Sequence, residues 1–140
     1  MKKFSFNLEK VLKLRKFHEE ECKIELGRAV SALNIIENNI KETAVKRHNA
    51  AVNRFTDTTQ ILSWDIYISR LEQETERLME QAARAEIVVE EKRALYLEAQ
   101  KDLKAIEKLK EKREKEYRKE TLNYEMAQVD DLTAARWASL

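Results

Sequence analysis

His18 and Cys22 come closest to a chemical site of any residues in this sequence. Four residues apart on a helix, they would share one face, where an imidazole and a thiol can act as base and nucleophile or supply two metal ligands. A zinc site usually needs three or more protein ligands, and the chain has no second Cys. We therefore interpret Cys22 as a small core residue and His18 as a surface residue. We expect no catalytic residues, no cofactor and no metal.

The single glycine, Gly27, cannot form a phosphate-binding loop, because one Gly within a helical pattern does not provide the required nest of backbone amides. It either costs the helix about 1 kcal/mol relative to Ala or allows a neighbour to approach closely. His48 has no carboxylate cluster near it in the sequence, and we expect it to be exposed. Together these residues argue against an enzyme.

The composition favours very long helices. Of the 140 residues, 38% are charged, one is Gly and none is Pro, so few chain reversals are available and strand-rich folds are excluded. The 27 basic and 26 acidic residues nearly balance, which gives no case for a nucleic-acid partner. The longest aliphatic run is only Ile87-Val88-Val89, so we expect no signal peptide and no direct membrane insertion. A lone Cys fits a reducing cytoplasm.

Apolar residues recur at alternating spacings of three and four, the pattern of a coiled-coil seam. In the second half this seam continues for about six heptads, with one break at Lys92. Its members are Ile61, Trp64, Ile68, Leu71, Thr75, Leu78, Ala82, Ala85, Val89, Lys92, Tyr96, Ala99, Leu103 and Ile106. The first-half seam is strongest from Cys22 to Ile40. Its members are Leu8, Leu12, Arg15, Glu19, Cys22, Leu26, Ala29, Leu33, Ile36, Ile40, Thr43, Arg47 and Ala50.

Between the two seams, Asp57 followed by Gln60 resembles a capping box, which would start a new helix. A reversal at Asp57 places Leu26 opposite Val89 and Leu33 opposite Ala82, so that large and small residues interdigitate. A parallel homodimer of one unbroken helix is the structural alternative.

The sequence thus predicts one all-α domain over residues 1–140, a long antiparallel two-helix coiled-coil hairpin. The first helix spans about residues 5–55, the tip about 56–59 and the longer second helix about 60–136. At 1.5 Å per residue the arms measure roughly 75 Å and 115 Å. Residue 4 would pair near residue 111, so that everything after about Lys112 overhangs unless another chain covers it. This point lies within the charged run KAIEKLKEKREKEYRKE.

Apolar and aromatic residues are in surplus near the predicted tip. A two-helix tip has one seam, so Trp64 and Ile68 can be buried while Leu62, Ile66 and Tyr67 point elsewhere. Large exposed apolar patches mark binding sites, and we expect a partner site here. A broad local seam that closes over a loose turn is the alternative. The full set is Phe55, Ile61, Leu62, Trp64, Ile66, Tyr67 and Ile68.

Two segments carry a family resemblance. FSFNLEKVLKLRKFHEEECKIELGRA resembles the opening signature of the flagellar FliJ family, and KDLKAIEKLKEKREKEYRKETLNYEMAQVDDL is similar to its second, a basic segment followed by an acidic pair. The chain departs from the family at Ile106, where Leu is frequent, and at Asp130-Asp131, where the family has Asp-Glu. The resemblance covers essentially the whole chain.

The resemblance implies a soluble component of the flagellar type III export apparatus, which serves flagellum biogenesis and so motility and chemotaxis. It implies a coiled coil similar to the γ stalk of rotary ATPases, located in the pore of the hexameric export ATPase, whose assembly and activity it promotes. Further implied partners are the cytoplasmic domain of the export gate and the export chaperones. The implied location is cytoplasmic, peripheral to the inner membrane. A generic coiled-coil spacer, or the equivalent stalk of a non-flagellar type III secretion system, is the alternative.

Two surfaces follow as hypotheses. A basic collar near both termini would bind the ATPase through Leu8, Leu12, Lys13, Arg15, Lys16, Lys108, Lys110, Lys112 and Arg113. The tip would bind the export gate through Trp64, Tyr67, Leu71 and Leu78, although Leu71 and Leu78 also lie on the seam and can be core residues.

Overall fold

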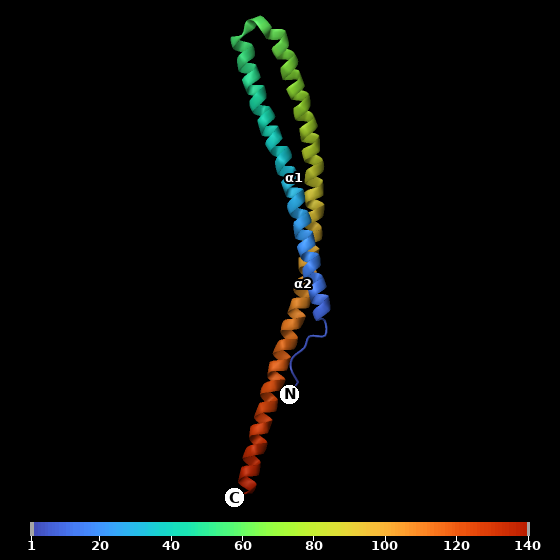
Figure 1. Cartoon of the computed structure of the whole chain (residues 1–140), viewed down its shortest axis with the longest axis vertical. Helices are drawn as coiled ribbons and strands as arrows, with labels where there is room; N and C mark the ends of the chain where they lie inside the picture. The colour runs from blue at the N-terminus through green and yellow to red at the C-terminus, as the bar shows by residue number, and fades with distance from the viewer. Residues whose placement is uncertain (1, 140) are drawn as a thin grey trace. The chain divides into compact units, whose positions relative to one another are not determined.

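The computed structural model describes residues 2–139 and is all-helical. Its elements are α1 (Glu9–Thr56), a short 3-10 helix η1 (Thr58–Gln60) and α2 (Ile61–Ala138). The helices run antiparallel and pack against each other, with the turn at residues 57–60 joining them (Figure 1). This confirms the predicted all-α hairpin with a longer second helix, and the parallel alternative is wrong. Of the predicted domain, Met1 and Leu140 lie outside the described residues.

The hairpin consists of two compact units. One contains residues 2–19 and 98–139 and is called the terminal unit below. The other contains residues 20–97, including the turn, and is called the tip unit. Each unit contains one stretch of α1 and one of α2, so each has its own section of the seam.

The turn is organised by Asp57. Its carboxylate accepts a hydrogen bond from the backbone N–H of Thr59 at 3.3 Å and another from the Thr59 hydroxyl at 2.6 Å. Asp57 is thereby the N-cap of η1, which leads directly into α2. An ion pair between Arg54 Nε and Asp65 Oδ1, at 2.5 Å, joins the helices beside the turn. The predicted role of Asp57 in starting the second helix is confirmed, with one 3-10 turn interposed.

The predicted seam is the interface between the helices. Every seam residue predicted on α1 is buried or half-buried, and the same holds on α2 except for Ile61, which is 37% exposed. Even Lys92, which breaks the apolar pattern, is half-buried. Burial of one Leu or Val side chain is worth about 1.5–3 kcal/mol, so this stripe accounts for the packing of two otherwise polar helices. The most buried apolar members are Leu12, Ala29, Ala50, Leu71, Leu78, Ala82, Val89 and Ala99.

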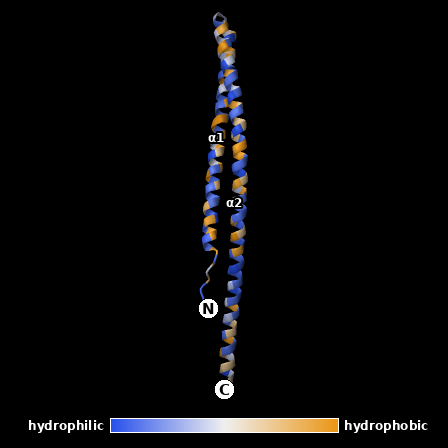
Figure 2. Ribbon diagram, turned by 90° about the vertical axis from the view of Figure 1, so that its right-hand side faces the viewer, coloured by the Kyte–Doolittle hydropathy of each residue, from blue (hydrophilic) through white to orange (hydrophobic). Residues whose placement is uncertain are grey.

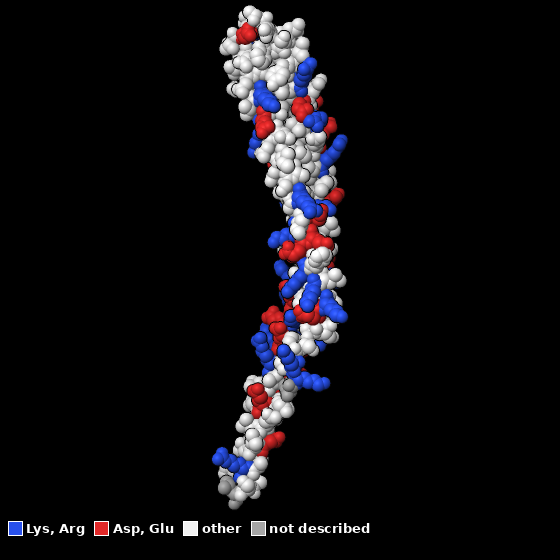
Figure 3. All heavy atoms as spheres, in the orientation of Figure 1, with Lys and Arg blue, Asp and Glu red and all other residues white. Residues whose placement is uncertain are grey.

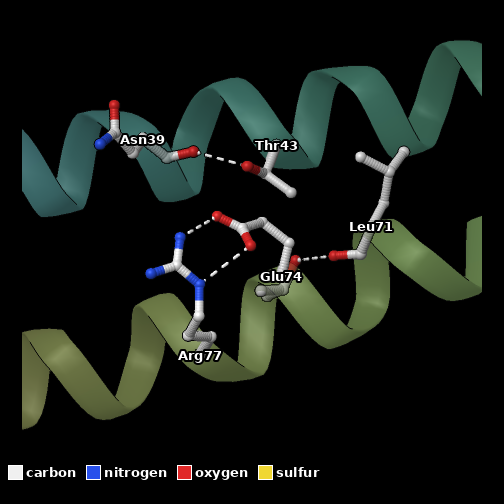
Figure 4. A network of polar contacts seen from close by, with 6 residues as sticks. Asn39, Thr43, Leu71, Glu74 and Arg77 are labelled. Atoms are coloured by element: carbon white, nitrogen blue, oxygen red, sulfur yellow. Dashed lines mark hydrogen bonds and ion pairs between the residues drawn. The ribbon is translucent and has the colours of Figure 1, made fainter.

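Two threonines occupy seam positions without leaving a polar group unsatisfied. The hydroxyl of Thr43 donates to the carbonyl of Asn39, and that of Thr75 donates to the carbonyl of Leu71, both at 2.8 Å. Each bond stays within one helix, so the seam can include a hydroxyl without a partner on the other helix. Figure 4 shows the Thr43 bond beside the ion pair of Glu74 and Arg77 on α2.

Candidate partner-binding surfaces

In the terminal unit, four residues of the predicted ATPase surface help to hold the two helices together. Leu12 is 2% exposed and Leu8 is half-buried. Arg15 forms an ion pair with Asp102 at 2.9 Å, and Lys110 forms one with Glu9 at 3.0 Å. These four side chains already contact other parts of the terminal unit.

The remaining predicted residues of this surface are exposed. We call them the basic collar: Lys13, Lys16, Lys108, Lys112 and Arg113. Acidic side chains lie among the basic ones, as Figure 3 shows for the charged part of the terminal unit. Glu111, for example, forms an ion pair with Lys115 at 3.3 Å. The collar is therefore a set of individually exposed cations on the two helices of the terminal unit.

The N-terminal residues 2–8 differ from the prediction. They form neither helix nor strand, and α1 begins at Glu9 rather than at about residue 5. The ring of Phe4 lies 5.4 Å from that of Tyr117, and the Tyr117 hydroxyl donates a 2.6 Å hydrogen bond to the carbonyl of Lys2. Phe6 is 8% exposed. We call residues 2–8 the strap, since they lie against α2 in place of a helical turn.

The strap extends the covered part of α2. Glu9, the first residue of α1, pairs with Lys110, and the carbonyl of Lys2 pairs with Tyr117, so the seven strap residues run along seven residues of α2, as far as a helix would reach. Lys2 thus lies against Tyr117, whereas the prediction placed residue 4 near residue 111. Beyond Tyr117, Thr121 is also half-buried, and its hydroxyl donates to the Tyr117 carbonyl at 2.9 Å. The prediction that α2 overhangs after about Lys112 is wrong, and every residue from 122 to 139 is exposed.

A period-two alternation in the sequence could have revealed the strap. In FSFNL, residues 4–8, apolar and polar residues alternate, which is typical of an extended segment with one covered face. The structure follows it, with Phe4 and Leu8 half-buried, Phe6 buried, and Ser5 and Asn7 exposed. The prediction treated these residues as the start of a helix because Leu8 continues the coiled-coil spacing.

In the tip unit, the residues predicted to bind the export gate fall into two classes. Leu71 and Leu78 are 9% and 4% exposed and form part of the interface with α1. Trp64 is half-buried, and its ring packs edge-on against that of Tyr67, with centroids 6.2 Å apart. The indole Nε1 of Trp64 is enclosed and has no hydrogen-bond partner among the described residues. Of these four residues, Tyr67 is exposed and Trp64 is half-buried.

The tip carries a largely apolar surface. Trp64 and Ile68 are half-buried, while Leu62 and Ile66 are 74% and 50% exposed and Tyr67 points outward, as predicted. Figure 2 shows apolar colouring close to the turn, and Figure 3 shows few charges there. Beside these residues lies a hollow of about 400 Å³, lined by Lys46, Asn49, Ala50, Asn53, Trp64 and Tyr67.

No catalytic or metal site is apparent among residues 2–139. His18 is exposed and Cys22 half-buried, and no three His, Cys, Asp or Glu side chains of this range are grouped as metal ligands would be. His48 is exposed. A Cβ added to Gly27 would meet no atom within 4 Å, so Gly27 does not serve a close helix approach. None of the described helices contains a segment apolar enough to cross a bilayer.

The sequence model described as "Flagellar FliJ protein" matches residues 4–139, nearly the whole chain. No curated protein and no solved structure matches significantly.

Proposed function

Since the chain belongs to the flagellar FliJ protein family, and so is a component of the flagellar export apparatus, we propose that it is the stalk and escort of that apparatus. In this proposal the terminal unit binds the hexameric export ATPase and promotes its assembly and activity. The tip unit binds the cytoplasmic domain of the export gate, and the protein escorts export chaperones. The proposed location is the cytoplasmic side of the inner membrane, at the export apparatus.

The observation that carries the ATPase assignment is the change along α2 within the terminal unit. In the terminal unit α2 contacts α1 and the strap as far as Tyr117, whereas from Leu122 to Ala138 it continues as a single exposed helix. A single helix is narrow enough to enter a ring, and the basic collar lies where the rod widens to two helices. Charges at such a rim mainly control the encounter rate and its salt dependence.

Charge reversal in the collar tests this assignment. A variant with Lys13→Glu, Lys108→Glu and Lys112→Glu should need about tenfold more protein for half-maximal stimulation of the purified export ATPase, because rim charges steer encounter. The matched control reverses three exposed cations of the tip unit, Lys23, Lys41 and Arg84, and should stimulate normally. Absence of stimulation by the unmodified chain in stoichiometric excess would refute the ATPase assignment.

The exposed apolar surface of the tip supports the gate assignment. Truncation of buried aromatic anchors commonly costs an interface 2 kcal/mol or more, roughly thirtyfold in affinity. Trp64→Ala with Tyr67→Ala should therefore weaken binding of the gate's cytoplasmic domain at least tenfold. ATPase stimulation should be unaffected.

Trp64 is half-buried, so a second variant avoids a folding defect. Leu62→Ser with Ile66→Ser changes only exposed side chains and should also weaken gate binding. Its control, Leu95→Ser with Leu97→Ser, changes side chains that are 55% and 56% exposed elsewhere in the tip unit. Equal affinities of the tip variants and the control would refute the placement of the gate site and leave the ATPase assignment intact.

A further inference from the structure

We propose that the strap is an autoinhibitory latch: in the free protein it occupies the face of α2 around Arg113 and Tyr117, and it must lift for the ATPase ring to take that face. This inference rests on the proposed function, because it assigns a regulation to the same ATPase-binding surface. It concerns the terminal unit alone.

The strap lies against one residue that a ring-binding surface would use and beside another. Arg113 belongs to the basic collar, and it lines a hollow formed jointly by strap and α2. Tyr117 is half-buried by the ring of Phe4 and hydrogen-bonded to the carbonyl of Lys2. An aromatic ring and an Arg one turn apart are the residue types that anchor protein interfaces most often. A partner that docks on this face therefore meets the strap first.

The strap's contacts with α2 are of a kind that can open locally. It forms neither helix nor strand, and its backbone bonds to α1 come from its last residues: the Glu9 N–H donates to the Phe6 carbonyl at 3.1 Å and the Leu12 N–H donates to the Leu8 carbonyl at 2.9 Å. Against α2 it contributes the Phe4–Tyr117 ring contact, the bond accepted by Lys2, and the burial of Phe6. Segments with few buried contacts and an exposed backbone open at a small fraction of the global stability.

The space beneath the strap supports the same conclusion. Strap and α2 line a hollow of about 190 Å³, to which Ser5, Asn7, Glu116 and Glu120 contribute polar lining. These four residues are exposed, so the hollow is open to solvent. The strap thus lies on α2 through two aromatic side chains and leaves the space between them polar, so lifting it exposes little apolar surface beyond Phe4, Phe6 and Tyr117.

The latch is tested by locking and releasing the strap in the full chain. Ser5→Cys with Glu116→Cys, in a Cys22→Ser background, places thiols on the strap and on α2 at the rim of this hollow. A short bifunctional methanethiosulfonate then ties the strap down, and reduction frees it. The locked chain should need at least fivefold more protein for half-maximal ATPase stimulation, and reduction should restore the parent value. The same chain treated with a monofunctional methanethiosulfonate is the control.

Release is tested by Phe4→Ala with Phe6→Ala, which should lower the concentration for half-maximal stimulation at least threefold. Helicity from circular dichroism checks that the chain folds. If this variant loses helicity, Tyr117→Phe replaces it as the test, because this change removes only the hydrogen bond to Lys2. It should likewise lower the concentration for half-maximal stimulation.

Each outcome is decisive. Stimulation by the parent chain with no change on locking or release overturns the latch and leaves the proposed function standing. Weaker stimulation after release, with helicity intact, shows that the strap is part of the binding surface and also overturns the latch. No stimulation by the parent chain overturns the proposed function, and the latch with it.

Discussion

The tip unit and the terminal unit use one seam pattern but close it differently. In the tip unit a covalent turn joins the helices, with Asp57 capping η1 and Arg54 paired to Asp65 beside it. In the terminal unit no turn joins them. Instead α1 is preceded by the strap, held on α2 by side-chain contacts, and α2 continues alone beyond Thr121.

This difference determines whether a surface at the end of the helix pair is always available to a partner. A covalent turn keeps two helix ends together at all times, so apolar side chains beside it can be exposed without loss of the local fold. A closure made of side chains can open, which means that the surface beneath it is available to a partner only part of the time. The tip unit is thus suited to constant presentation of a surface, and the terminal unit to conditional presentation.

The largest expected effect contrasts two core leucines. Leu78→Ala in the tip unit should cost about 2–5 kcal/mol of unfolding free energy, the range for a buried Leu that leaves a cavity. Leu12→Ala should fall at the low end of that range, because Leu12 lies in the first turns of α1, where the end of the helix can relax into the space. Hydrogen exchange resolved by peptide, with urea unfolding, measures both. A larger loss of unfolding free energy for Leu12→Ala than for Leu78→Ala would contradict this expected difference between the two units.

The turn provides the next effect. Asp57→Ala removes the cap of η1 and should destabilise the tip unit by about 1 kcal/mol. Asp57→Asn keeps a side-chain acceptor and should cost much less. Thermal unfolding of the two variants makes the comparison. Equal losses would show that the charge of Asp57, and not its hydrogen bond, supports the turn.

Gly27→Ala should stabilise the tip unit by about 0.5–1 kcal/mol. The position is helical, exposed and open around the missing Cβ, so Ala lowers the entropy of the unfolded chain without a clash. Ala32→Gly, on the exposed face of the same helix, is the opposite control and should cost a similar amount. Urea midpoints at constant slope check both changes. A loss on Gly27→Ala would reveal a contact that needs Gly.

The ion pair between Arg15 and Asp102, which joins the two helices in the terminal unit, should contribute less to the free energy of unfolding than the changes above. A double-mutant cycle with Arg15→Met and Asp102→Asn should give a coupling of about 0.2–1 kcal/mol, because both side chains are about 40% exposed and solvent screens the pair. The coupling should fall further in 1 M salt. A salt-independent value above this range would mean that the terminal unit is held by charges more strongly than the tip unit.

The smallest effect concerns pH. A hydrogen bond from Arg77 lowers the pKa of Glu74 below its ordinary value; partial desolvation opposes this shift, and the charge of Arg77 adds to it. A lowered folded-state pKa adds stability above the unfolded-state pKa, and this stability is lost as pH falls through the folded-state value. Glu74→Gln should therefore be slightly less stable than the parent near pH 7 and equal to it well below pH 4. A difference that persists in acid would point to packing instead.

Much of the fold could be predicted because the spacing of the seam residues along the sequence is enough to specify it. Alternating spacings of three and four put one stripe on each helix, and residues as different as Lys92, Thr43 and Ala99 are covered because of their position. The turn at Asp57 could be predicted because its capping chemistry is local. The start of α1 could not, because Leu8 fits both the coiled-coil period and the alternation of the strap, and only packing decides between them.

The candidate surfaces were less predictable for the same reason. Whether a residue is available to a partner depends on what else the chain places against it. Leu71 and Leu78 were candidates for the gate surface, and they are covered by α1. Arg15 and Lys110 were candidates for the ATPase surface, and each is paired with an acidic residue far away in the sequence.

The sequence by itself determined two long helices, the residues of their common seam and the position of the turn. Each of these follows from local spacing or local hydrogen bonding. Tertiary structure alone decided that residues 2–8 lie on α2 as a strap, that the strap reaches Tyr117, and which cations remain exposed. The physical reason is that burial and ion pairing depend on contacts between residues about a hundred positions apart, such as Lys2 with Tyr117, which no local pattern encodes.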